Sequence, residues 1–157
     1  MNEQKLQFLK NEFIPLLQKI DGAARGSWGL MNGQQMVEHF CDTVKNASGK
    51  LILPVVNQGE ALEKSRNFLF SEKPLRENTK NPLLPETPLV LRKADMETAI
   101  EKLGEELNYF FKVFENNPGL VTSNPFYGEL DYAGNVQLLH KHALHHLRQF
   151  GIDATLK

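Results

Sequence analysis

The sequence predicts an all-α protein, specifically a four-helix bundle in which a long irregular crossover joins the second and third long helices. Two observations carry this prediction. Apolar residues recur at steps of three and four in four separate segments, and no segment shows the convincing apolar-polar alternation of a half-buried strand. The length of 157 residues fits one domain of ordinary size, so we expect residues 1–157 to form a single domain.

The first helix is predicted near the N-terminus by apolar residues at helical spacing. These are Leu6, Leu9, Phe13, Leu16, Leu17 and Ile20. The helix is expected to end at Asp21-Gly22. Because Pro15 has no backbone N–H, it should kink this helix or shift its start.

The second helix follows a glycine-rich connector, residues 22–33, and is predicted to begin at Asn32. Gln35 stands three residues later, where it can complete a variant of the capping box. The apolar stripe of this helix consists of Met36, Phe40, Val44 and Ala47. His39 lies along one edge of that stripe.

The crossover, residues 48–92, is interrupted by proline too often to hold a long element. The prolines are Pro54, Pro74, Pro82, Pro85 and Pro88. One short helix is expected at about residues 59–70. Because the segment keeps many apolar side chains, we expect it to pack on the bundle as a lid or a wrapped connection.

The third and fourth long helices have clear boundaries. Apolar residues at helical spacing between Met96 and Phe114 mark the third, which Asp95 opens and residues 116–119 close. After the turn-rich residues 124–130, Asp131 can cap the last helix and Gly151 can supply its left-handed end.

Composition excludes some functions. Eighteen basic and nineteen acidic residues give a formal net charge of −1, which disfavours a nucleic-acid partner. The single cysteine, Cys41, rules out an internal disulfide framework and suits a reducing compartment. Glu, Gln, Lys and Asn are mixed with the apolar residues throughout residues 1–20, so we expect no signal peptide, no membrane-spanning helix and no membrane partner. The sequence therefore predicts a cytoplasmic protein.

Four of the five histidines fall between residues 140 and 146, on the last helix. His142 and His146 lie one turn apart on its apolar face, the spacing that lets two imidazoles reach one ion. A divalent ion needs at least a third ligand, and His39 is the only histidine outside the cluster. We therefore predict a metal site formed by His39, His142 and His146, with a water completing the coordination.

Alternatives remain open for this cluster. A helical His-x-x-x-His pair often arises by chance, and His142 also shares a face with His145, which could replace His146 as the ligand. His145 is otherwise expected near the ligands or at the surface. His140 projects away from the apolar face and is expected to be solvated.

Several other residues near the site could either support the histidines or serve only the packing and capping of the helices. Gln35 and Gln149 could each orient an imidazole through its second nitrogen, although helix capping explains Gln35 equally well. Glu38 points about 100° away from His39 and is expected on a solvated face. Lys141 is expected to be solvated and Cys41 to be a packing residue.

Three stretches resemble a known family. HALHHLRQFGI (residues 142–152), NPFYGEL (residues 124–130) and SWGLMNGQQMVEHF (residues 27–40) resemble the DinB/YfiT-like superfamily of proposed metalloenzymes, in particular a DinB-like branch without an assigned function. In that superfamily a four-helix bundle with a long crossover carries a metal on three histidines, one from the second helix and two from the last. The resemblance therefore implies the ligands His39, His142 and His146.

The resemblance also implies a range of activities. Some relatives are S-transferases that use low-molecular-weight thiols such as bacillithiol or mycothiol, one is a maleylpyruvate isomerase, and others are metal-dependent hydrolases. The expected function is thus a hydrolase or thiol S-transferase in which zinc or nickel activates water or a thiol against a small-molecule substrate. The catalytic residues themselves stay unassigned. The alternative is a non-catalytic metal-binding or dimerising bundle, and since relatives often pair, a homodimer is expected.

Overall fold

The computed structural model describes residues 1–155, and this part of the chain is mostly helical, as predicted. The helices are α1 (Glu3–Asn11), α2 (Phe13–Leu17), α3 (Gly33–Ala47), α4 (Gly59–Phe70), α5 (Met96–Asn116) and α6 (Tyr132–Gln149). The strands are β1 (Thr122–Asn124) and β2 (Gly128–Leu130). Within residues 1–155, no helix has a stretch long and apolar enough to cross a membrane.

The predicted first helix is divided into α1 and α2 at Glu12. The amide nitrogen of Glu12 still donates to the carbonyl oxygen of Phe8, at 2.9 Å, but Pro15 has no N–H to donate to the carbonyl of Asn11. The break therefore falls one turn before the proline. Both short helices keep their apolar faces inside, and Phe13 and Leu17 are completely buried.

The predicted helix boundaries are confirmed where a polar side chain caps the first turn. Asn32 Oδ1 accepts from the amide of Gln35 while Gln35 Oε1 accepts from the amide of Asn32, both at 2.9 Å. Asp95 and Asp131 cap α5 and α6 through the side chain alone, accepting from the amides of Thr98 and Gly134 at 2.8 Å each. At the other end of α6, Gly151 has a φ of +83°, the left-handed conformation that favours glycine.

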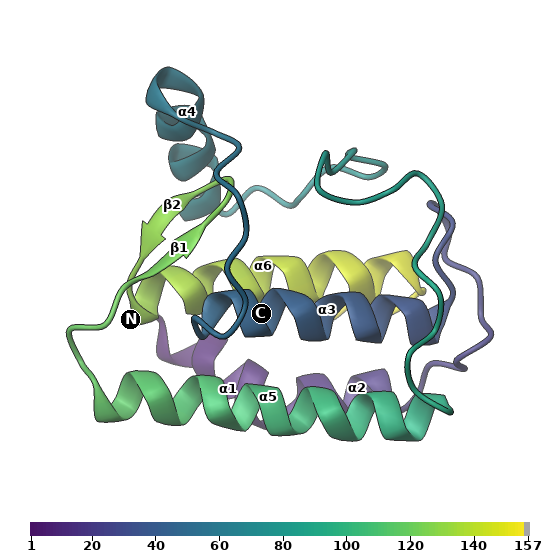
Figure 1. The fold of residues 1–157 in the computed structure, drawn as a ribbon. Coiled ribbons are helices and arrows are strands. Elements are labelled where there is room, and N and C mark those ends of the chain that lie inside the picture. Colours follow the sequence, from purple (N-terminus) through teal and green to yellow (C-terminus); the bar gives the residue numbers. More distant parts are fainter. Residues whose placement is uncertain (156–157) are drawn as a thin grey trace.

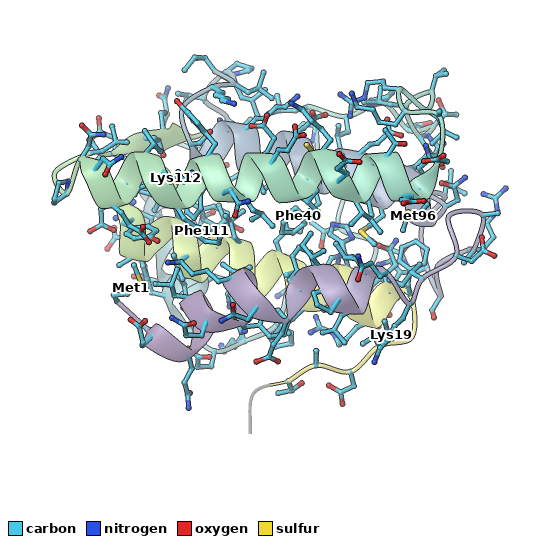
Figure 2. The ribbon with its side chains drawn as sticks, turned by 90° about the horizontal axis from the view of Figure 1, so that it is seen from below. Met1, Lys19, Phe40, Met96, Phe111 and Lys112 are labelled. Atoms are coloured by element: carbon cyan, nitrogen blue, oxygen red, sulfur yellow. The ribbon has the colours of Figure 1, made fainter. Side chains whose placement is uncertain are left out.

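The helical core lies between α3, α5, α6 and the α1–α2 pair (Figure 1). The view in Figure 2 places α5 on one side and the N-terminal helices on the other, with side chains filling the space between them. Phe13 and Phe40 meet there with ring centroids 4.8 Å apart. The apolar residues predicted for the core face of α5 are buried from Ile100 to Phe114, whereas Met96 is only partly buried.

A small antiparallel hairpin, β1 with β2, was not predicted. Its strands have three residues each, too short to show an alternating pattern, and Thr122 pairs with Leu130. The turn is held by Asn124 Oδ1, which accepts from the amides of Phe126 and Tyr127 at 2.9 and 3.1 Å. The turn-rich residues 124–130 therefore form a strand pair rather than a plain loop.

The crossover contains α4 at the predicted residues, but it packs on the core only in places. Leu69 is fully buried, whereas Ile52 and Val90 are exposed. Lys141, which we expected to be solvated, is instead buried and donates to the backbone oxygens of Ser71 and Lys73. A buried cation on α6 thus fixes the chain just after α4.

Candidate metal centre

The structure brings the three predicted histidines together between α3 and α6. One ring nitrogen from each of His39, His142 and His146 lies within 4.8 Å of the others. The ring centroid of His39 lies 5.4 Å from that of His142 and 5.3 Å from that of His146. Within residues 1–155, no cysteine or carboxylate belongs to this cluster.

Local structure explains why these side chains meet. The capping box at Asn32 fixes the start of α3, and Asp131 fixes the start of α6, so both helices have defined registers. Phe40, the residue after His39, is fully buried between the two helices, with its ring centroid 5.2 Å from that of His142. Packing of this aromatic ring holds the histidine faces toward each other.

The closest contact in the cluster joins the two histidines of α6. Nε2 of His142 lies 2.7 Å from Nε2 of His146. Two unprotonated nitrogens at this distance would repel each other through their lone pairs, so the space between them must hold a proton or a cation. Nδ1 of His146 lies 2.8 Å from Oε1 of Gln149, so Gln149 orients this imidazole through its second nitrogen. Gln35 does not, because it serves the cap of α3.

Burial favours the neutral form of the three histidines. It lowers the pKa of His142 and of His146 well below the ordinary value, and the neighbouring histidines lower each pKa further. It also lowers the pKa of His39, a shift that Asp42 opposes and Arg92 reinforces. A neutral imidazole is the form that binds a metal, so the cluster does not have to lose charge first.

His145 lies beside the cluster and is not part of it. Its ring centroid is 5.1 Å from that of His146 and 5.4 Å from that of Trp28. Burial, with the charge of Arg148, lowers the pKa of His145 to about 4. The geometry therefore favours His146 over His145 as the third nitrogen.

His140 corrects the expectation of a solvated side chain. It is 4% exposed and its ring meets that of Phe8 edge-on, with centroids 5.2 Å apart. Burial lowers its pKa to about 4, and the charge of Lys5 lowers it too. The side of α6 that carries His140 is covered by α1, so this histidine is a packing residue remote from the other three.

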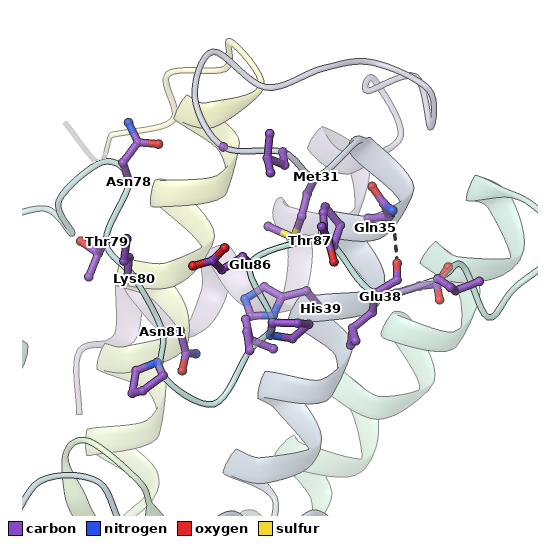
Figure 3. Close-up of a pocket in the computed structure, with 18 of the residues that line it drawn as sticks. Met31, Gln35, Glu38, His39, Asn78, Thr79, Lys80, Asn81, Glu86 and Thr87 are labelled. Atoms are coloured by element: carbon purple, nitrogen blue, oxygen red, sulfur yellow. Dashed lines mark hydrogen bonds between the residues drawn. The ribbon is translucent and has the colours of Figure 1, made fainter.

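A cavity of about 960 Å³ opens beside His39, between the first turn of α3 and residues 78–92 of the crossover (Figure 3). Its apolar walls include Leu30, Met31 and Leu84, and its polar lining includes Glu86 and Thr87. Sequence reasoning did not find the crossover residues of this cavity, because a proline-rich segment has no periodicity from which its position could be derived. Among these crossover residues, Glu86 contributes a carboxylate to the lining of the cavity.

Glu38 also corrects an expectation, since we expected it on a solvated face. It is 6% exposed, and its Oε1 accepts from the backbone nitrogen of Arg92 at 2.7 Å and from Nε of Arg92 at 3.3 Å. Arg92 also donates to Asp42, at 3.0 Å. This pairing fastens the end of the crossover to α3, one residue from His39. Cys41 is buried, which raises the pKa of its thiol and agrees with a packing role.

The residues present fit a divalent metal ion. Nitrogens that share one zinc at about 2.0–2.1 Å in a tetrahedron lie roughly 3.4 Å apart, and the ring nitrogens of this cluster lie within 4.8 Å of one another. All three donors are neutral imidazoles, His146 already has an oxygen partner for its second nitrogen, and His39 faces a cavity.

Comparison of the chain with protein-family models, curated proteins and solved structures gives no match.

Proposed function

We propose that this protein is a metal-dependent enzyme of the DinB-like type, a four-helix bundle in which His39, His142 and His146 hold a zinc or nickel ion. The observation that carries the proposal is the convergence of three neutral imidazoles from two helices beside a large cavity. Structural zinc sites usually have four protein ligands, whereas catalytic sites have three and keep one position for water or substrate. A three-histidine cluster beside a cavity matches the second kind.

The bound ion would supply a Lewis acid that lowers the pKa of a water or of a low-molecular-weight thiol. The residues of the chain have separate tasks around it. Gln149 orients His146, and the Glu38–Arg92 pair holds the cavity wall against α3. Glu86 offers a carboxylate in the same cavity as His39, where it can exchange a proton with a bound nucleophile.

The cavity indicates the kind of substrate. Its volume of about 960 Å³ lies within the range of small-molecule sites and far exceeds the space that a water needs. Leucine, methionine and proline side chains make up much of its wall. We infer that the substrate is a small electrophile with an apolar body whose reactive carbon approaches His39.

Elemental analysis of the purified protein tests the metal, and turnover assays test the enzyme. We expect about one zinc or nickel per chain, lost in His39→Ala and retained in the matched variant His145→Asn. The metal-loaded protein should then hydrolyse activated esters or conjugate a thiol to a model electrophile. A chain without bound metal would contradict the proposal, and a stoichiometric ion without turnover would favour a metal-binding protein.

A second candidate function is self-association as a non-catalytic bundle. Leu89, Val90 and Leu91 are consecutive exposed apolar residues on the crossover, and Val90 is 86% exposed. Such a run is uncommon on a monomer surface and favours a contact with another copy. Sedimentation of wild type and Val90→Lys tests this: a dimer that dissociates in the variant supports it, and a wild-type monomer excludes it.

A further inference from the structure

The amide of Gln149 has its orientation fixed by two partners. Nε2 of Gln149 donates to the backbone oxygen of Trp28 at 2.9 Å, and Oε1 of Gln149 lies 2.8 Å from Nδ1 of His146. A backbone carbonyl only accepts hydrogen bonds, so the amide nitrogen must face Trp28 and the amide oxygen must face His146. Because that oxygen also only accepts, Nδ1 of His146 must carry a proton.

A glycine-rich loop encloses this amide. The backbone nitrogen of Ser27 donates to the backbone oxygen of Gln149 at 2.7 Å, which joins the loop to the end of α6. A Cβ at Gly26 would lie 2.8 Å from Cγ of Gln149, and one at Gly29 would lie 3.0 Å from its Nε2, at a φ of +74°. Only glycine leaves room for the side chain at these two positions. The loop therefore acts as a cradle for Gln149, which is buried.

The protonation of His146 determines that of His142. A neutral imidazole carries one proton, so a proton on Nδ1 leaves Nε2 of His146 as a bare lone pair. Nε2 of His142 lies 2.7 Å away. In the metal-free protein this contact is attractive only if His142 carries its own proton on Nε2 and donates it to His146.

We propose that Gln149 and its glycine cradle, residues 26–29, preset His146 as the Nδ1-protonated tautomer, so that its Nε2 is ready to bind a cation, whereas His142 has to change tautomer. For Nε2 of His142 to bind a cation, its proton would pass to water, and Nδ1 of the same ring would take up a proton from water. Neither the number of protons nor the charge of the ring changes. Gln149 is thus a positioning residue for the centre.

The same loop also reaches the cavity. Gly29, Leu30 and Met31 line it, next to the residues that enclose Gln149. One connector therefore holds the amide that orients His146 and forms a wall of the space beside His39. A change in the loop should alter the tautomer of His146 without touching any of the three histidines.

Nuclear magnetic resonance of the metal-free protein with ¹⁵N-labelled histidine tests the tautomers directly. In wild type we expect His146 to show a protonated Nδ1 and a bare Nε2, and His142 to show a protonated Nε2. Gln149→Met removes the acceptor and should release His146 from this form. Gln149→Glu keeps an oxygen for His146 but loses the donor to Trp28, so it should retain the tautomer. A protonated Nε2 on His146 in wild type, or an unchanged tautomer in Gln149→Met, overturns the proposal.

Two further measurements separate this inference from a general packing effect. Gly26→Ala should displace Gln149 and reproduce the tautomer change with the glutamine still present, whereas Gly104→Ala, whose Cβ meets nothing within 4 Å, should not. Zinc affinity from competition with a chelator should fall about 10- to 100-fold in Gln149→Met and less in Gln149→Glu. This last arm rests on the proposed function. The tautomers are measured without metal, so a chain that binds no zinc contradicts the proposed function alone.

Discussion

Binding of the ion should stabilise the fold by an amount set by the ratio of the free ion concentration to the dissociation constant. Only the folded chain brings His39 of α3 to His142 and His146 of α6, so the ion binds the native state in preference to the unfolded one. A free zinc concentration a hundredfold above the dissociation constant then adds about 2.7 kcal/mol to the free energy of unfolding. For a chain of this length that corresponds to a rise of roughly 5–11 °C in the midpoint of thermal unfolding.

The assay is thermal unfolding, followed by circular dichroism, of protein first treated with a chelator and then measured with and without zinc. In His39→Ala the shift should nearly disappear, because the remaining pair lies within one turn of α6 and lacks a ligand from another helix. His145→Asn is the matched control and should keep the full shift, since His145 lies outside the cluster. Equal shifts in wild type and His39→Ala would refute the reasoning, and so would no shift in wild type.

Three other predictions concern the packing that supports the centre. Gly33→Ala should lower the free energy of unfolding by about 1–3 kcal/mol in urea titrations, because the new Cβ would lie 2.4 Å from the backbone oxygen of Asp21; an unchanged midpoint would contradict this. Burial raises the pKa of Glu106, but hydrogen bonds from two lysines lower it, so the pKa lies below the ordinary value overall. The charge of Glu106 therefore stabilises the fold above the unfolded carboxyl pKa. This contribution is lost as the pH falls through the folded pKa. Glu106→Gln should therefore be less stable than wild type at neutral pH, and urea titrations in acid should show this difference shrinking. Arg92→Met removes the guanidinium that donates to Glu38 and Asp42, leaving only the backbone bond of residue 92 to Glu38, and should speed limited proteolysis within residues 78–92, whereas equal cleavage rates would mean that other contacts hold the segment.

The features predicted correctly depend on residues close together in the sequence. The capping box of Asn32 and Gln35 spans three residues, and the His142–His146 spacing spans four. Such patterns can be recognised because a helix relates residues three and four apart by fixed geometry. His39 was added from a separate helix by elimination, as the remaining histidine, and its position in the structure shows that the apolar faces of α3 and α6 do meet.

The features that the sequence did not reveal depend on helices with more than one covered side. An angular argument assumes one buried face and one solvated face, but α6 packs against α1, α3 and α4. His140 and Lys141, placed outside the main apolar stripe, are therefore buried under α1 and the end of α4. Glu38 is buried for a related reason, because the chain at Arg92 crosses the outer face of α3. No local sequence pattern indicates that Glu38 pairs with a residue 54 positions away.

The centre and its cavity are built from different parts of the chain, and this division has a functional consequence. The nitrogens come from α3 and α6, whose relative position is fixed by the buried core around Phe40. Much of the cavity wall comes from residues 78–92, which are fastened to α3 mainly at Arg92 and, through Gln35, at the backbone oxygen of Leu89 (Figure 3). Substitutions in the crossover can therefore change the shape of the cavity while leaving the nitrogens in place. Under the proposed function, the helices would determine which ion is held, and the crossover would determine which small molecule reaches it.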